Sequence, residues 1–145
     1  MASPRNSERW QPDAGSGGWL TWIEVLGWHG SRRGIHRGRY GVSVLYDEGL
    51  SGYQNTGRGG RLTYMGAGRG GDQTLTGGNA LLAECRRTGE PVRVFDRLRP
   101  GCWQDRGWHR VESVSVGAQG GRLVYWFSLT PVDRGLGMAG CGRPG

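Results

Sequence analysis

The sequence predicts an α+β domain built around a curved, mainly antiparallel sheet. Strand-like runs rich in β-branched and aromatic residues come in groups, and one helix-like segment precedes each group. This order differs from the regular strand–helix alternation of a doubly wound parallel sheet. A chain of 145 residues is long enough for one domain with a modest core. We expect that domain over residues 19–134, between polar, Gly-rich flexible tails at 1–18 and 135–145.

The first predicted helix covers residues 19–28, about two turns. Its apolar residues recur at i, i+3, i+4 and i+7, which places them on one helical face. These residues are Trp19, Trp22, Ile23 and Leu26. We expect the tryptophans to pack in the core or at an interface, and the segment from Gly27 to Gly34 to end the helix in a loop.

Five runs have the composition of strands. They are residues 40–47, 61–66, 90–98, 107–117 and 121–132. The first two are separated by the turn-rich stretch 50–60, so we expect a hairpin or meander. The last two are expected to pair around the glycine-rich turn at 117–121.

The second predicted helix covers residues 79–89 and ends at Gly89. One side of it is apolar and consists of Leu81, Leu82 and Cys85. Asp72 or Thr76 is expected to cap its start, because short oxygen-bearing side chains accept from the free N–H groups there.

Composition points to an acidic partner. The formal net charge is +7, and all 19 basic residues are arginine. A planar guanidinium suits phosphate and stacked bases, which favours nucleic acid. The absence of lysine excludes a Schiff-base enzyme and a phosphate loop that ends in Gly-Lys-Ser/Thr.

The cysteines and the N-terminus exclude other classes. Cys85, Cys102 and Cys141 are far apart and form no C-x-x-C pair, so neither a metal site nor a disulfide framework is expected. No apolar stretch approaches the ~20 residues of a membrane span, and the first 18 residues have no signal-like apolar region. We expect a cytoplasmic, nucleoid-associated protein.

Residues 66–71, Gly-Ala-Gly-Arg-Gly-Gly, match the pattern G-x-G-x-x-G. A dinucleotide site requires a helix that opens directly on such a loop within a βαβ unit. Here a polar, turn-rich stretch follows and the apolar helical run begins only near Ala80. The glycines therefore serve another purpose.

Several segments together resemble the SRA (YDG) domain, in the bacterial branch found in modification-dependent restriction enzymes. They are GIH at 34–36, SGYQN at 51–55, LTYMGAGRGGDQTL at 62–75, NALL at 79–82 and PVRV at 91–94. The resemblance covers roughly residues 22–130. One departure is the Y-D-G signature, where Gln104-Asp105-Arg106-Gly107 stands instead.

The resemblance implies an SRA/PUA-like, β-barrel-like curved sheet with flanking helices. It also implies binding of double-stranded DNA that contains modified cytosine, 5-methylcytosine first, with the base flipped into a pocket. Tyr53 and Tyr64 would stack on the base, and Asn55 would accept from its amino group, with Asp47 in reserve. The expected pocket consists of Asp47, Ser51, Gly52, Tyr53, Asn55, Thr56, Tyr64 and Met65.

The same resemblance places the DNA-gripping surface mainly in residues 31–40. Arg32 would fill the space that the flipped base vacates, and other arginines would contact phosphates. The expected DNA-binding residues are Arg32, Arg33, Gly34, His36, Arg37, Arg39 and Arg69. The glycine loop would let the backbone approach DNA or a neighbouring turn closely.

No catalytic constellation is expected, because His29, His36 and His109 are scattered along the chain. We therefore interpret the protein as a stand-alone reader of modified cytosine without enzyme activity or cofactor. Two alternatives stay open at this point. One is the recognition subunit of a restriction nuclease whose catalytic part lies on a partner chain, and the other is an RNA-binding module.

Overall fold

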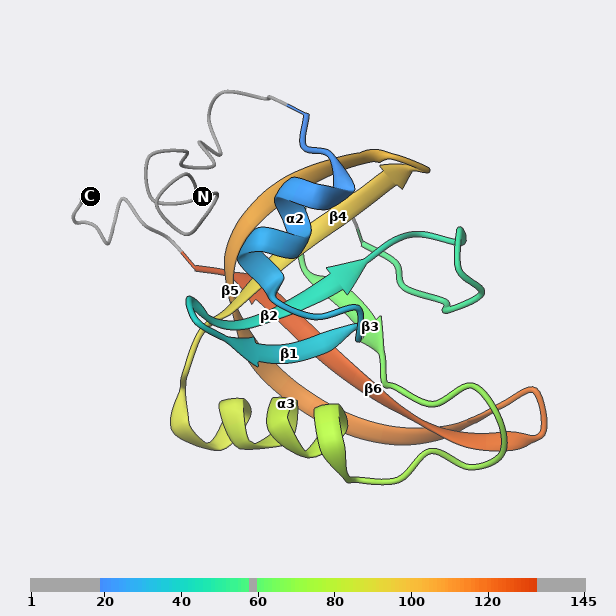
Figure 1. Ribbon diagram of the computed structural model, residues 1–145. Helices are drawn as coiled ribbons and strands as arrows, with labels where there is room; N and C mark the ends of the chain where they lie inside the picture. Colours follow the sequence, from blue (N-terminus) through green and yellow to red (C-terminus); the bar gives the residue numbers. More distant parts are fainter. Residues whose placement is uncertain (1–18, 58–59, 133–145) are drawn as a thin grey trace.

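In the described part of the chain, two helices pack against a single curled sheet (Figure 1). The computed structural model describes residues 19–57 and 60–132, so the predicted tails lie outside the described residues. The elements are α2 (Trp22–His29), β1 (Ile35–Gly38), β2 (Gly41–Tyr46), β3 (Leu62–Met65), α3 (Gly77–Thr88), β4 (Val92–Arg99), β5 (Cys102–Gln119) and β6 (Arg122–Pro131).

The strand order is β1-β2-β4-β5-β6-β3. All neighbouring pairs are antiparallel except β2 with β4. The sheet curls, so that β3 at one edge reaches β2 near the other: the Tyr64 hydroxyl on β3 donates to the Leu45 carbonyl on β2 at 3.0 Å. The predicted class, a curved and mainly antiparallel α+β fold, is confirmed.

The hairpin predicted between residues 40–47 and 61–66 is wrong. β2 pairs with β1 and β4, while β3 pairs with β6. The segment that joins β2 to β3 is a long loop rather than a tight turn. The buried Asn55 side chain links both its ends, since it donates to the Asp47 carbonyl and accepts from the Met65 N–H.

The apolar face predicted for the first helix is also wrong. Trp19 and Ile23 are 60% and 72% exposed, whereas Val25 and Trp28 are buried. Thr21 caps the helix in a capping box with Glu24, so α2 begins three residues later than the start of the apolar pattern. Trp19 therefore lies outside the helix.

The second helix is confirmed, with its C-terminus at Gly89 in the left-handed region (φ 83°). Thr76 stands at the N-cap position but makes no side-chain cap bond, and Asp72 accepts from the Leu123 N–H instead. β1 was not predicted, and β5 begins earlier than the predicted run at 107–117.

Two apolar clusters hold the sheet and the helices together. The larger lies between the sheet and α3 and includes Tyr46, Tyr64, Leu82, Phe127 and Leu129. The smaller packs α2 onto the sheet and consists of Leu20, Val25, Trp28, Phe95 and Trp103. Tyr64 and Trp103 also reach the cavity described next, so the core itself positions two walls of the site.

Candidate functional site

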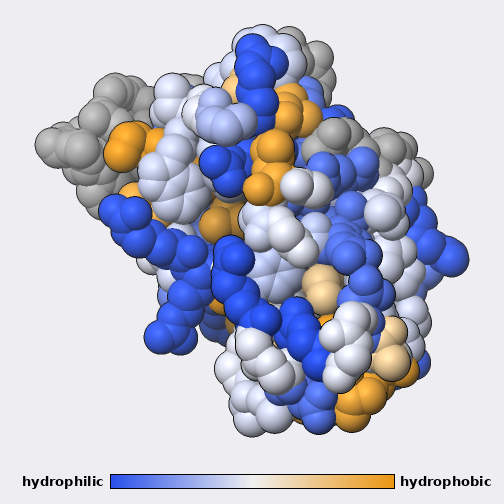
Figure 2. All heavy atoms as spheres, turned by 90° about the vertical axis from the view of Figure 1, so that its right-hand side faces the viewer, coloured by the Kyte–Doolittle hydropathy of each residue, from blue (hydrophilic) through white to orange (hydrophobic). Residues whose placement is uncertain are grey.

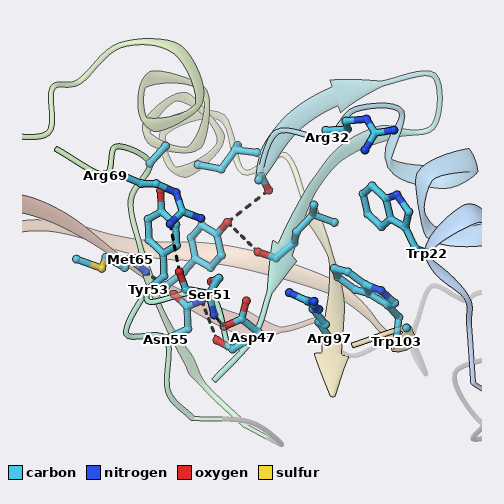
Figure 3. A pocket seen from close by; sticks show the side chains of 16 residues that line it. Trp22, Arg32, Asp47, Ser51, Tyr53, Asn55, Met65, Arg69, Arg97 and Trp103 are labelled. Atoms are coloured by element: carbon cyan, nitrogen blue, oxygen red, sulfur yellow. Dashed lines mark hydrogen bonds between the residues drawn. The ribbon is translucent and has the colours of Figure 1, made fainter. Parts of the chain in front are cut away.

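A cavity of about 510 Å³ opens between α2, the loop after β2, β3 and the turn from β4 to β5 (Figure 3). Cavities of about 300–1,000 Å³ are typical of small-molecule sites, with aromatic walls and a few polar groups. The predicted residues that line it are Arg32, Gly34, Asp47, Ser51, Tyr53, Asn55, Tyr64, Met65 and Arg69. Residues separated by up to 37 positions in the sequence thus meet at one site.

Tyr64 forms a rigid wall of the cavity. It is 5% exposed, and its hydroxyl bond to the Leu45 carbonyl fixes the ring across the gap between β3 and β2. Burial, with Tyr53 and Asp47 nearby, raises the pKa of Tyr64 above its ordinary value. The hydroxyl therefore remains a donor at neutral pH.

Tyr53 is the more accessible tyrosine and comes from the loop between β2 and β3. The Arg69 guanidinium lies 5.2 Å from the Tyr53 ring centroid and also donates to the Ser51 carbonyl at 3.3 Å. Arg69 therefore ties the glycine loop to the loop that carries Tyr53, in a cation–π arrangement.

Asp47 and Asn55 differ in how many of their side-chain polar atoms already have hydrogen-bond partners. Asn55 is 4% exposed; its Nδ2 donates to the Asp47 carbonyl at 2.9 Å, and its Oδ1 accepts from the Met65 N–H at 2.8 Å. Asp47 uses Oδ1 to accept from the N–H groups of Leu50 and Ser51. Within residues 19–57 and 60–132, Asp47 Oδ2 has no hydrogen-bond partner and is the freer acceptor.

The glycine loop at 66–71 is held by two buried amides. Gln73 donates to the carbonyls of Gly66 and Gly68 and accepts from the Tyr125 N–H on β6. Asn79, at the start of α3, bonds both backbone groups of Ala67 and the Thr74 carbonyl.

Glycine is required at position 66 because a Cβ there would lie 2.8 Å from the side-chain oxygens of both amides. The G-x-G pattern thus allows a close approach of protein groups to backbone. Sequence reasoning missed both amides as scaffolding, although they lie in the D-Q-T-L and N-A-L-L segments.

The arginines of residues 31–40 are not equivalent. Arg32 is exposed and lines the cavity, whereas Arg37 forms a two-bond ion pair with Glu90, at 2.6 and 2.9 Å. Arg39 lies over the Tyr40 ring, 5.5 Å from its centroid. Arg32 is therefore the member of this group nearest to the cavity.

His29 fixes the loop that carries Arg32. Its Nε2–H donates to the Arg33 carbonyl at 2.5 Å, and its Nδ1 accepts from the Ser43 hydroxyl at 2.6 Å. Burial lowers the pKa of His29, and the neighbouring His36 acts in the same direction, against the bond to Arg33. His29 is thus a neutral link between α2, β2 and the loop.

Some predicted residues lie away from the cavity lining. Thr56 forms a backbone bridge with Thr63, and Gly52 is an exposed turn residue with φ 91°. His36 packs edge-on against His29, with ring centroids 5.9 Å apart. Arg33, Arg37 and Arg39 are also outside the lining.

Sequence reasoning missed several cavity residues, and the large side chains among them are Trp22, Arg97 and Trp103. The two indole rings lie 5.5 Å apart between centroids, tilted by 33°. Trp22 was expected to pack in the core or at an interface, and Trp103 precedes the strand predicted at 107–117. No sequence signal placed these residues beside Tyr53 and Tyr64, because only the curl of the sheet brings them there.

The face shown in Figure 2 is largely hydrophilic, with separate apolar patches between polar side chains. Among the described residues, no group of three or more His, Cys, Asp or Glu could hold a metal ion. No helix in the described part of the chain is both long and apolar enough to cross a membrane.

The curled six-stranded sheet and the arginine-edged aromatic cavity together define an SRA-type domain. The model of the ScoMcrA-like SRA domain family matches residues 27–136. The chain therefore belongs to the ScoMcrA-like SRA domain family, and the resemblance seen in the sequence is confirmed. No curated protein matches the chain.

Solved structures agree with this assignment. The SUVH5 SRA domain in complex with fully methylated CG DNA superposes with a TM-score of 0.65 and 25% identity, over 78% of this chain and 85% of that one. The same domain bound to fully hydroxymethylated CG DNA gives a TM-score of 0.66 and 24% identity, over 79% and 86%. SUVH6 of Arabidopsis thaliana, in complex with SAM, gives 0.63 and 26%, over 80% of this chain and 25% of SUVH6.

Proposed function

We propose that this protein is a non-enzymatic reader that binds double-stranded DNA containing modified cytosine. The observation that carries the proposal is the cavity itself, in which two tyrosines and a carboxylate meet beside Arg32 and Arg69. The SUVH5 SRA domain, of similar fold, was solved with methylated and with hydroxymethylated DNA. The net charge of +7 favours the same partner.

We infer that the modified base leaves the duplex and enters between Tyr53 and Tyr64. Extrusion costs a few kcal/mol of stacking, which contact with aromatic faces returns at about 1–3 kcal/mol per base. Tyr64 is held by its bond to Leu45 and needs no rearrangement, while Tyr53 lies on a loop tied down by Arg69. Arg32 lines the cavity, and we propose that it occupies the gap left in the duplex.

Asp47 is proposed as the acceptor for the cytosine amino group. The sequence favoured Asn55, but both polar ends of that amide are occupied by backbone groups. A buried amino group left without an acceptor costs about 1–3 kcal/mol. Asp47 Oδ2, unpartnered within the described residues, supplies the acceptor at the cavity wall.

The test is fluorescence anisotropy with one duplex sequence that carries either cytosine or 5-methylcytosine, followed by incubation with Mg²⁺. We expect the methylated duplex to bind at least about tenfold more tightly, which corresponds to 1.4 kcal/mol, and both duplexes to stay intact. Equal affinity for the two duplexes contradicts the reader, cleavage supports the nuclease alternative, and preferential competition by structured RNA supports the RNA-binding alternative.

A further inference from the structure

The cavity continues past the two tyrosines into a second region with aromatic and cationic walls. Trp22, Arg97 and Trp103 line this region, which we name the tryptophan lobe (Figure 3). Trp22 comes from the first turn of α2, Arg97 from β4 and Trp103 from β5. The two indole rings pack against each other, with their centroids 5.5 Å apart.

Arg97 gives the tryptophan lobe an unused donor. Its side chain is partly buried and points into the cavity, towards Asp47 (Figure 3). Within residues 19–57 and 60–132 the guanidinium makes no ion pair or hydrogen bond. Neighbouring arginines of the same hairpin are paired: Arg93 with Asp105 and Arg106 with Asp96. A partly buried guanidinium with five donors and no acceptor favours a ligand that offers oxygen atoms.

The cavity is larger than the base requires. Its volume of about 510 Å³ lies in the range of drug-sized ligands, whereas a methylated cytosine is one small ring. Trp22, Arg97 and Trp103 line a part of the cavity other than the part between Tyr53 and Tyr64 (Figure 3). The tryptophan lobe combines an apolar surface with a guanidinium that is unpaired within the described residues. A ligand that covers the indole rings and also accepts hydrogen bonds from Arg97 would therefore bind there most favourably.

The lobe lies on the side to which a substituent at carbon 5 can extend. That carbon is next to the carbon that bears the amino group, and the amino group is proposed to face Asp47. On one side of Asp47 lie Asn55 and Met65, which are buried and line the cavity. On its other side lie Arg97 and Trp103 (Figure 3). A substituent on carbon 5 that is longer than methyl would therefore extend towards the tryptophan lobe.

We propose that the tryptophan lobe binds a hydroxyl-bearing substituent on carbon 5 of the flipped cytosine, a hexose joined through a hydroxymethyl group. The C–H face of the sugar would cover an indole ring, and Arg97 would donate to the sugar hydroxyls. This inference rests on the proposed function, since it requires the base to enter between the tyrosines. It makes Arg97 and Trp22 determinants of which modification is preferred.

The test uses the full chain and four duplexes that differ at one position: cytosine, 5-methylcytosine, 5-hydroxymethylcytosine and 5-(β-glucosyloxymethyl)cytosine. The glucosylated duplex is expected to bind about tenfold more tightly than the methylated one. Arg97→Met and Trp22→Ala should each remove most of this tenfold advantage, measured as the ratio of the affinities of one variant for the glucosylated and the methylated duplex.

Two neighbouring residues supply matched controls. Arg99 and Trp19 are exposed, contact each other at 5.8 Å and do not line the cavity. Arg99→Met and Trp19→Ala should keep the full preference for the glucosylated duplex. A methylated duplex that binds as tightly as the glucosylated one, or more tightly, overturns the tryptophan-lobe proposal and leaves the reader intact. Equal binding of all four duplexes, unmodified cytosine included, overturns the reader itself.

Discussion

Replacing Gln73 by alanine tests how the glycine loop is held. The side chain is 6% exposed and makes three bonds to backbone groups: to the Gly66 carbonyl at 2.8 Å, the Gly68 carbonyl at 3.1 Å and the Tyr125 N–H at 2.8 Å. Each such bond contributes about 1 kcal/mol, and a buried group left unpaired costs about 1–3 kcal/mol. Gln73→Ala should therefore lower the free energy of unfolding by about 3 kcal/mol.

That loss is a large part of the roughly 5–15 kcal/mol by which a domain of this kind is stable. Denaturant titration followed by tryptophan fluorescence measures it directly. Gln54→Ala is the matched control, since Gln54 is exposed and its side chain makes no hydrogen bond within the described residues. If the two variants lose the same free energy, below about 1 kcal/mol, the amide scaffold is refuted.

Three further predictions concern stability and DNA binding. The free energy of unfolding should fall as pH drops below about 6.5, because burial lowers the pKa values of His29 and His109, so that the unfolded chain binds more protons; denaturant midpoints measured across this range check it. Gly66→Ala should cost about 1–3 kcal/mol through overpacking, whereas Gly70→Ala, with nothing within 4 Å of the added Cβ, should be neutral in the same titration. Arg32→Ala should reduce the salt slope of DNA binding by about one unit.

Each of these has a contrary outcome. A stability that is flat or rises between about pH 6.5 and pH 5 contradicts the histidine argument. Equal unfolding free energies for the two glycine variants contradict the close-approach argument. Arg37→Ala is the control for Arg32, because Arg37 is already paired with Glu90; an equal loss of salt slope in both variants contradicts the distinction between them.

Local patterns predicted the second helix and all the described strands except β1, although the predicted run for β5 began too late. Gly89 in the left-handed region ends α3 where the sequence indicated, and Leu82 and Cys85 are buried on the predicted side. The pairing of strands was harder, because β2 and β4 are parallel neighbours although β3 and α3 lie between them in the chain. Short-range spacing contains no information on such a crossover.

The first helix shows a second limit. The spacing of Trp19, Trp22, Ile23 and Leu26 is helical, but the face that packs is the one with Val25 and Trp28. The prediction followed the four large apolar residues and did not consider the capping box of Thr21 and Glu24, which fixes where the helix begins. Tertiary packing, not periodicity, decided which side of the helix is buried.

For the site, the family resemblance identified Tyr53, Tyr64 and Asp47, and the structure brings all three to one cavity. The tryptophan lobe could not be found in this way, because its members come from α2, β4 and β5 and meet only through the curl of the sheet. The sequence also could not show the side-chain hydrogen bonds of Asn55. Because of these bonds, Asp47 rather than Asn55 is the better acceptor for the cytosine amino group.

The central claim, that a modified cytosine is flipped into the tyrosine pocket, is tested most directly by a fluorescent base analogue beside 5-methylcytosine in a duplex. Binding should brighten the analogue, because unstacking relieves its quenching. Tyr53→Ala should weaken binding of the methylated duplex about tenfold or more, as expected for a loss of 1–3 kcal/mol of stacking, and leave unmethylated binding nearly unchanged. No brightening, together with full discrimination in Tyr53→Ala, would show that the methyl group is read without flipping.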